Sequence, residues 1–490
     1  MSTNNLIYGI EGKPSFGKLL VFAFQQVLAV LAATIAVPAI IGLPVQIPSA
    51  ILGAGLGTLV YLLFTKFKSP VVISSSFAFL GALSNALAFG YMGILLGGLF
   101  AGLVYVIIAL VVRFAGTAWI DKLMPPVIIG PTVALIGLSL AGAAMGDIIK
   151  ANSDPVNGGY NLVALLCGLV TFMTIVICSV QGKFKSARLV PFILGIGAGY
   201  AVASIFTIIG NVANLDYLKI INWSPIVDNF KNLSVESFVT YPRFALIEGI
   251  QELISGNVGA DVLGANPNAT VITLAGVAEV ALAFVPVAFV VFAEHIADHK
   301  NLSSIVGQDL LKEPGLTRTL LGDGVGSMVG TAFGVCPNTT YGESVGCVAI
   351  TRNASVRTIF VAAIMLIVLS FLTPLTALLR TIPSCVMGGV CLTLYGFIAV
   401  SGFKMFQKVD LNNNKNLFTI SAILIAGIGG LSIQIPYAID SGTGAVTSTI
   451  QITSIATALF LGIITMVVCN AIEKRNNQQQ ASNKDADLDE

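Results

Sequence analysis

Apolar runs long enough to cross a lipid bilayer recur along the whole chain. A membrane-spanning helix needs about 20 predominantly apolar residues, and 56% of the 490 residues are hydrophobic while 10% are charged. Soluble proteins have about 25% charged residues, so a water-soluble globule of this length would lack the polar surface that it needs. The sequence therefore indicates an all-α polytopic membrane protein and argues against a soluble enzyme or a nucleic-acid partner.

Fourteen candidate spans, seven in each half, have approximate cores at residues 16–41, 47–64, 71–89, 93–112, 126–144, 161–178, 189–210, 273–295, 316–333, 340–350, 358–372, 386–401, 417–431 and 450–472. Lys and Arg concentrate in the cytoplasmic loops of membrane proteins. With fourteen spans and the N-terminus inside, 20 of the 25 basic residues fall on the cytoplasmic side. We therefore predict fourteen spans in the cell membrane, with both termini cytoplasmic.

Seven spans in each half would place the second half upside down relative to the first. Two such inverted seven-segment repeats are typical of secondary transporters. The predicted organisation is a cytoplasmic N-terminal segment, a first repeat, a long extracellular loop, a second repeat and a polar, disordered cytoplasmic tail, at residues 1–15, 16–210, 211–272, 273–472 and 473–490.

Two spans are interrupted by polar residues at corresponding positions of the halves. Residues 70–77 (PVVISSSF) and 337–343 (PNTTYGE) each begin with Pro and contain a polar run where an apolar helix is expected. Non-helical backbone at membrane depth occurs only where protein or water satisfies its polar groups, and paired broken segments point to the central site of a transporter. The alternative, favoured more for the Ser run than for the run with the carboxylate, is a shallow helix end with a polar cap.

Three acidic residues lie within or at the edge of predicted spans. Glu294 ends an apolar run, Asp298 lies one helical turn further on the same face, and Glu343 begins a half-segment, where the helix dipole favours negative charge. Ionisable residues inside a membrane are costly and mark functional sites. A carboxyl group that holds a proton in one state and releases it in another is what coupling to a proton gradient requires.

Other polar residues carry weaker signals. Glu279 and Asp323 lie nearer to segment ends, where an interfacial place is about as plausible as a functional one, and His295 and His299 are predicted to be interfacial partners of nearby groups. The chain has two His, and its seven Cys include no CxxC pair. No metal site and no cofactor are predicted, and no converging nucleophile, base and orienting group indicates an enzyme.

Residues 337–346 (PNTTYGESVG), followed by 349–352 (AITR), closely resemble the signature of the nucleobase–ascorbate transporter (nucleobase–cation symporter-2) family, in the version found in its bacterial uracil permease branch. Residues 293–295 (AEH), 75–79 (SSFAF) and 321–324 (LGDG) resemble three further motifs of this family. The resemblance covers roughly residues 16–472.

This resemblance implies fourteen spans in two inverted repeats, a core domain facing a gate domain, and short strands in the third and tenth segments that meet at mid-membrane. It implies that Glu294 and Glu343 hydrogen-bond the base, that the backbone of Phe77 and Gly342 contacts the ring substituents, and that Tyr341 lines the site. The implied function is import of uracil with protons by alternating access.

Two positions depart from the family pattern. Gln26 and Asp298 stand where family members commonly have His, so Asp298 or the neighbouring His299 would relay the proton beside Glu294. The alternatives are a purine (xanthine or urate) symporter on the same fold and an anion transporter, which the scarcity of Lys and Arg in the span cores disfavours. The predicted partners are uracil or a related nucleobase, protons and the lipid bilayer, and a homodimer remains open.

Overall fold

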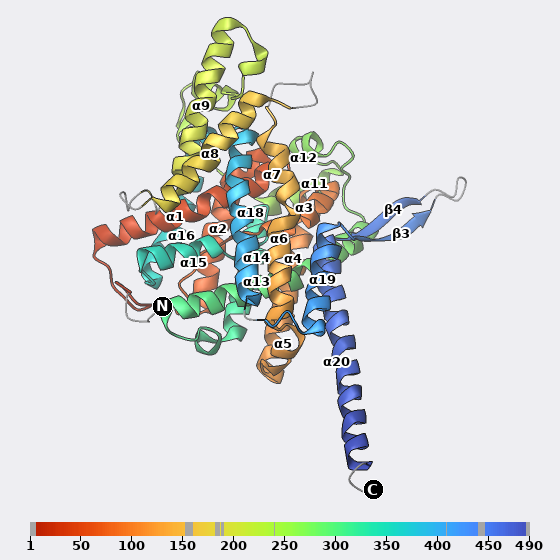
Figure 1. Ribbon diagram of the computed structural model, residues 1–490. Helices are drawn as coiled ribbons and strands as arrows, with labels where there is room; N and C mark the ends of the chain where they lie inside the picture. The colour runs from red at the N-terminus through yellow and green to blue at the C-terminus, as the bar shows by residue number, and fades with distance from the viewer. Residues whose placement is uncertain are drawn as a thin grey trace.

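The computed structural model describes residues 6–151, 160–181, 187, 191–239, 241–407, 409–439 and 446–486. Helices make up most of it (Figure 1). The helices of the first half are α1 Phe16–Ile40, α2 Ile47–Phe64, α3 Leu80–Ala86, α4 Gly90–Ala115, α5 Ala118–Leu123, α6 Pro126–Ser139, α7 Ala141–Ile148, α8 Leu162–Val180 and α9 Pro191–Ala213. Those that follow are α10 Ser224–Lys231, α11 Ala245–Ser255, α12 Ala260–Ala265, α13 Leu274–Val306, α14 Leu316–Phe333, α15 Gly342–Thr351, α16 Val356–Ser370, α17 Thr373–Arg380, α18 Ser384–Phe406, α19 Asn414–Ile428 and α20 Ser454–Ala486.

Nine helical segments in the described part of the chain are long and apolar enough to cross a membrane, and α16 and α19 are shorter apolar helices. The chain is thus an all-α polytopic membrane protein, as predicted.

The predicted long loop contains the short helices α10, α11 and α12. The sequence predicts a disordered tail from residue 473, whereas α20 continues as a helix through Ala486, in a stretch that contains neither Gly nor Pro to end it. Residues 487–490 of the predicted tail lie outside the described residues.

The helices pack in two groups, and each group combines elements from both halves of the chain. In the first group, α14 packs against α2 and α4, α16 against α1 and α2, and α13 against α4. In the second group, α18 packs against α6, α7 and α8, α9 against α8, and α19 against α6 and α20. Figure 1 shows α20 extending away from the second group towards the C-terminus, and the hairpin of β3 Ile433–Ile439 and β4 Val446–Ile452 projecting beside it.

Two three-residue strands replace helix inside the first group, in the two broken segments that the sequence predicts. β1 Ile73–Ser75 pairs antiparallel with β2 Asn338–Thr340, in the register Ile73↔Thr340 and Ser75↔Asn338. All six residues are buried, so neighbouring side chains and the ladder must satisfy their backbone N–H and C=O groups. The Thr58 hydroxyl, for example, bonds both the N–H and the C=O of Ile73 at 3.1 Å.

Closely packed glycines hold β2 in place. A Cβ atom added to Gly57 of α2 would lie 2.9 Å from the carbonyl oxygen of Gly326 in α14, so only glycine permits this approach of the two helices. The side chain of Asn338 fills the space beside Gly57 and Gly330, and its amide donates to the carbonyl of Gly53 at 2.9 Å. This packing fixes the strand from which the site is built.

A carboxylate from the loop caps the start of α4. Glu252 of α11 accepts from the backbone N–H of Tyr91 at 2.7 Å and of Gly259 at 3.1 Å. The first N–H groups of a helix have no partner inside it. In Glu252→Gln one acceptor oxygen becomes an NH₂ group, and leaving a buried N–H unsatisfied costs about 1–3 kcal/mol. We expect a lower melting temperature for purified Glu252→Gln than for wild type.

The same carboxyl group should make the stability of the folded protein depend on pH. Burial raises the pKa of Glu252 above its usual value of 4.5, so between the two pKa values the folded state binds more protons than the unfolded state. The stability from this group is therefore fully present below pH 4.5 and is lost as pH rises through the folded pKa. Thermal unfolding across this range should show the loss in wild type and in Glu236→Gln, an exposed control from the same loop, but not in Glu252→Gln. Parallel curves for all three proteins would contradict this role.

Candidate functional site

A cavity of about 310 Å³ lies between the two helix groups. The first group contributes Ser76 and Phe77 after β1, Thr339 and Thr340 of β2, and residues from the start of α15 and the middle of α13. The strands end at the cavity, so backbone that leaves the ladder there is free to meet a ligand. All six residues that the sequence predicts for substrate binding or proton coupling line it: Phe77, Glu294, Asp298, Tyr341, Gly342 and Glu343.

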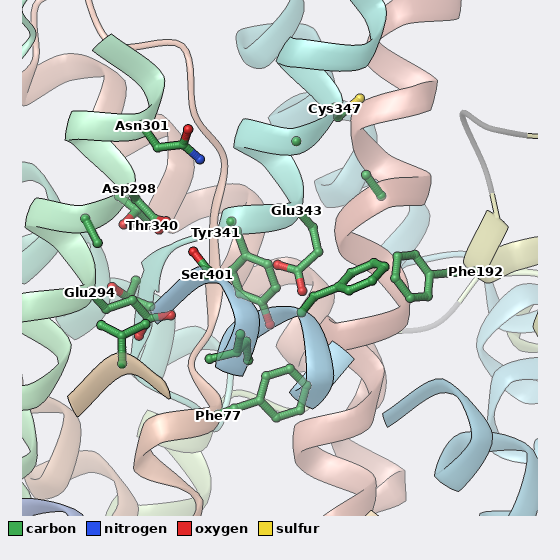
Figure 2. A pocket seen from close by; sticks show the side chains of 18 of the residues that line it. Phe77, Phe192, Glu294, Asp298, Asn301, Thr340, Tyr341, Glu343, Cys347 and Ser401 are labelled. Atoms are coloured by element: carbon green, nitrogen blue, oxygen red, sulfur yellow. Dashed lines mark hydrogen bonds between the residues drawn. The ribbon is translucent and has the colours of Figure 1, made fainter. Parts of the chain in front are cut away.

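Two carboxylates enter the cavity from α13. Glu294 and Asp298 lie one turn apart, and Figure 2 shows both on the same side of the cavity. Asp298 accepts a hydrogen bond from the Thr340 hydroxyl at 3.0 Å. The Oε2 atom of Glu294 is buried and has no hydrogen-bond partner among the described residues. A buried oxygen of this kind calls for a donor, which a ligand in the cavity would provide.

The third carboxylate stands at the start of α15. Glu343 is the second residue of this helix and follows Gly342, so both lie where the helix dipole and free N–H groups are concentrated. Tyr341 precedes them, and its hydroxyl donates to the carbonyl of Ser75 at 2.6 Å. Figure 2 places the Tyr341 ring between Glu294 and Glu343. The Tyr341 hydrogen bond therefore fixes the spacing between the two sides of the site.

Gln26, one of the two departures from the family pattern, acts on the same helix. It is buried in α1, accepts from the Ser344 hydroxyl at 2.9 Å and directs its amide at the Ser344 carbonyl at 3.4 Å. The Ser344 hydroxyl also accepts from the N–H of Val72 at 3.0 Å. Gln26 thus positions the residue next to Glu343 and does not line the cavity itself.

The second helix group forms an apolar wall opposite the carboxylates. Phe77 packs edge-on against Tyr395 of α18 with ring centroids 5.3 Å apart. Phe192 of α9, Phe397 and Ser401 of α18 complete this wall. The sequence analysis missed these last three residues, because uncharged side chains in apolar spans give no signal that separates a cavity wall from helix packing or a lipid-facing surface.

Three polar residues for which the sequence allows an interfacial place are deeply buried inside the protein. His295 is 0%, His299 1% and Asp323 1% exposed, so all three face protein atoms and not water. The hydrogen-bond partners of the two histidine rings lie on α2 and α14, two other helices of the first group. Glu279, the fourth residue of uncertain place, is half-buried on α13 and does not line the cavity.

The arrangement suits a small, flat, polar-edged ligand. Carboxylate oxygens of Glu294 and Glu343 accept hydrogen bonds, while the backbone at Gly342 offers donors. Phe77 and the apolar wall provide flat and water-excluding surfaces. Most ligand sites combine such an apolar lining with a few placed polar groups.

Comparison with solved structures identifies the fold. The transmembrane domain of the cyanobacterial bicarbonate transporter BicA matches with a TM-score of 0.51 at 15% identity, over 93% of this chain and 99% of that one. The overall structure of SLC26A9 matches with a TM-score of 0.59 at 10% identity, over 93% of this chain and 65% of that one. Both are polytopic membrane folds of the same architecture as this chain.

Comparison of sequences identifies the family. The family model described as Permease family (Xan_ur_permease) matches residues 17–436. The uracil permease of Bacillus caldolyticus is 34% identical, over 94% of both chains, and that of Bacillus subtilis is 34% identical, over 98% of both. The uracil permease of Escherichia coli K12 is 32% identical, over 87% of this chain and 88% of its own length. The chain therefore belongs to this permease family of membrane transporters, together with the uracil permeases.

Proposed function

We propose that the protein imports uracil together with protons, by alternating access. The observation that carries the proposal is that Glu294 of α13 and Glu343 of α15, two helices of the second half, line one cavity together with Gly342 and with Phe77 from the first half. The uracil permeases of two Bacillus species, similar over nearly the whole chain, support uracil as the substrate.

The chemistry of uracil fits this set of groups. Uracil is neutral and planar, and its edge alternates N–H donors with C=O acceptors. The C=O oxygen of the protonated Glu294 and the carboxylate of Glu343 accept from the N–H groups, the backbone N–H groups at Phe77 and Gly342 donate to the carbonyls, and Tyr341 fixes the width of the site. A site built to pair these groups rejects analogues that leave its own polar atoms unpaired.

The proposed architecture is fourteen spans in two inverted repeats, at residues 16–210 and 273–472. In its support, each half contains one strand followed by a half-helix, β1 with α3 and β2 with α15, and the two strands run antiparallel. The first helix group would be the core domain and the second the gate domain, with the cavity between them. Rigid movement of one group against the other then alternates access to the site.

The cavity opens, on this proposal, towards the cytoplasm. Its lining includes Asn301 and Ile350, which lie shortly before the loops that carry Lys312 and Arg352. These basic loops are cytoplasmic by the positive-inside rule. Both termini would lie on the same side of the cell membrane.

Protons would be coupled through Glu294 and Asp298. Both are carboxylates of α13 at the cavity, and each exchanges a proton with whichever side the cavity faces. Protonation from outside favours uracil binding, and release inside weakens it. Accumulation against a gradient requires this mutual dependence of the two binding events.

The test is uptake of radiolabelled uracil into cells that lack their own permease. Saturable uptake that a protonophore abolishes is expected, with unlabelled uracil competing more strongly than thymine, xanthine or urate. Stronger competition by xanthine or urate would assign a purine symporter, and inhibition by bicarbonate or sulfate would favour an anion transporter. Uracil uptake that the protonophore does not reduce would refute symport with protons.

A further inference from the structure

A buried acid–base pair lies directly behind the cavity. The Oδ2 atom of Asp323 in α14 is 2.6 Å from Nδ1 of His295 in α13, and neither residue lines the cavity. One side chain connects the pair with the site, because the hydroxyl of Thr339, which does line the cavity, donates to the same Oδ2 atom at 3.3 Å. A change at the cavity can therefore affect the pair through Thr339, although neither residue of the pair lines the cavity.

The hydrogen bond on the other side of the His295 imidazole determines which ring nitrogens carry protons. Nε2 of His295 is 3.0 Å from the hydroxyl oxygen of Thr319, and this hydroxyl donates to the carbonyl of Leu316 at 3.1 Å. A hydroxyl has one hydrogen to donate, so in the state in which Thr319 donates to Leu316 it accepts from His295, and Nε2 carries a proton. The short contact between Nδ1 and Asp323 then requires a second proton between those two atoms.

The same geometry permits a state with one proton fewer. When the Nε2–H bond breaks and a water molecule takes the proton, the imidazole keeps one proton on Nδ1 and donates it to the Asp323 carboxylate. The Thr319 hydroxyl then turns from the Leu316 carbonyl to donate to the bare Nε2 atom. The net charge changes from zero to minus one, and every hydrogen bond of the pair survives.

We propose that Asp323, His295 and Thr319 form a proton site of their own, which gains and loses one proton during transport. The inference rests on the proposed proton-coupled uptake. It adds a second proton-binding site, separate from the carboxyl groups that line the cavity. Thr319 is a positioning residue here, since its hydroxyl accepts in one state and donates in the other.

The surroundings limit this site to one exchangeable proton. The titratable groups that face it are Glu294 and Asp298 of α13, Tyr105 of α4, with its ring 5.9 Å from His295, and the His299–Tyr61 pair. The His299 ring lies 4.1 Å from the His295 ring, so charging both imidazoles would place two cations in close contact.

His299 belongs to a separate buried hydrogen-bond chain. Its Nδ1 donates to the His295 carbonyl at 2.8 Å, and its Nε2 is 2.8 Å from the Tyr61 hydroxyl, which is in turn 2.8 Å from the hydroxyl of Ser69. Because His299 bonds the backbone of His295 and not its imidazole, this chain fixes the orientation of the neighbouring ring and does not hold the proton of the pair.

The experiment compares Thr319→Val with Thr331→Val. Both threonines are buried in α14 and bond a carbonyl of their own helix, but only Thr319 contacts His295. Thr319→Val leaves the Nε2–H of the protonated state without an acceptor, so that state is disfavoured. The pH profile of uracil uptake should move to lower pH by about one unit, while Thr331→Val keeps the wild-type profile. Identical profiles for the two variants would overturn the proposal.

Asp323→Asn provides a second readout. The amide of Asn donates to Nδ1 and preserves the contact, but it cannot exchange a proton. We expect net uracil accumulation to fall at least tenfold, whereas exchange of external for internal uracil, which needs no net proton movement, persists and loses its pH dependence. Wild-type accumulation in Asp323→Asn would overturn the proposal, whereas protonophore-insensitive uptake by the wild type would refute the proposed function itself.

Discussion

Glu294→Gln is expected to abolish net accumulation of uracil while leaving measurable binding. The Gln side chain keeps the length of Glu and one carbonyl acceptor, but it cannot take up or release a proton. Gln resembles the protonated Glu294 that binds uracil, so at most a neutral hydrogen bond of about 0.5–1.5 kcal/mol is lost, and about 1.4 kcal/mol corresponds to tenfold in affinity. Binding should therefore weaken by about tenfold or less. Uracil binding to purified protein and uptake into proteoliposomes with an imposed proton gradient measure the two effects separately.

The control for the Glu294 variant is Glu313→Gln. Glu313 is an exposed carboxylate that pairs with Lys68 and lies outside the cavity, so its loss should leave both readouts unchanged. If Glu294→Gln accumulates uracil as the wild type does, Glu294 is not the coupling residue. Coupling would then depend on another carboxyl group at or behind the cavity, namely Asp298, Asp323 or Glu343.

The parts of the fold that the sequence predicts depend on local patterns, such as the hydropathy of a run of residues. Long apolar runs predict spans such as α1, α4 and α13, because most residues of a spanning helix must be apolar whatever they pack against. The Pro-polar runs at 70–77 and 337–343 predict the strands for a similar local reason. The pairing of β1 with β2, over more than 260 residues of sequence, depends instead on the packing of α2 against α14, which no local pattern specifies.

The site shows the same division. Glu294 and Glu343 were predictable, since a carboxylate in an apolar segment is too costly to be incidental. The burial of His295 and His299 was not predictable, because each lies near the end of an apolar run. Only the tertiary structure shows that α13 continues to Val306 and that α2 and α14 supply hydrogen-bond partners for the two rings. Phe192 and Phe397 carry no charge, so the apolar wall could not be distinguished from ordinary helix packing.

Glu343→Gln is expected to weaken uracil binding more strongly than Glu294→Gln does but to spare coupling. Glu343 stands in the first turn of α15, where the helix dipole stabilises a negative charge. It is therefore suited to act as a fixed acceptor for a uracil N–H, whereas the Oε2 atom of Glu294 has no stabilising partner among the described residues. The neutral Gln loses the charged hydrogen bond, and the apparent KM should rise about 10- to 100-fold.

The ratio of protons to uracil taken up should stay at the wild-type value in Glu343→Gln, because Glu294 still exchanges its proton. Paired fluxes of labelled uracil and of protons into proteoliposomes, at uracil concentrations above the raised KM, measure this ratio. A ratio near zero would mean that Glu343 carries the proton and would exchange the roles of the two carboxylates. An unchanged KM would remove Glu343 from the binding site, even though its helix would still frame the cavity.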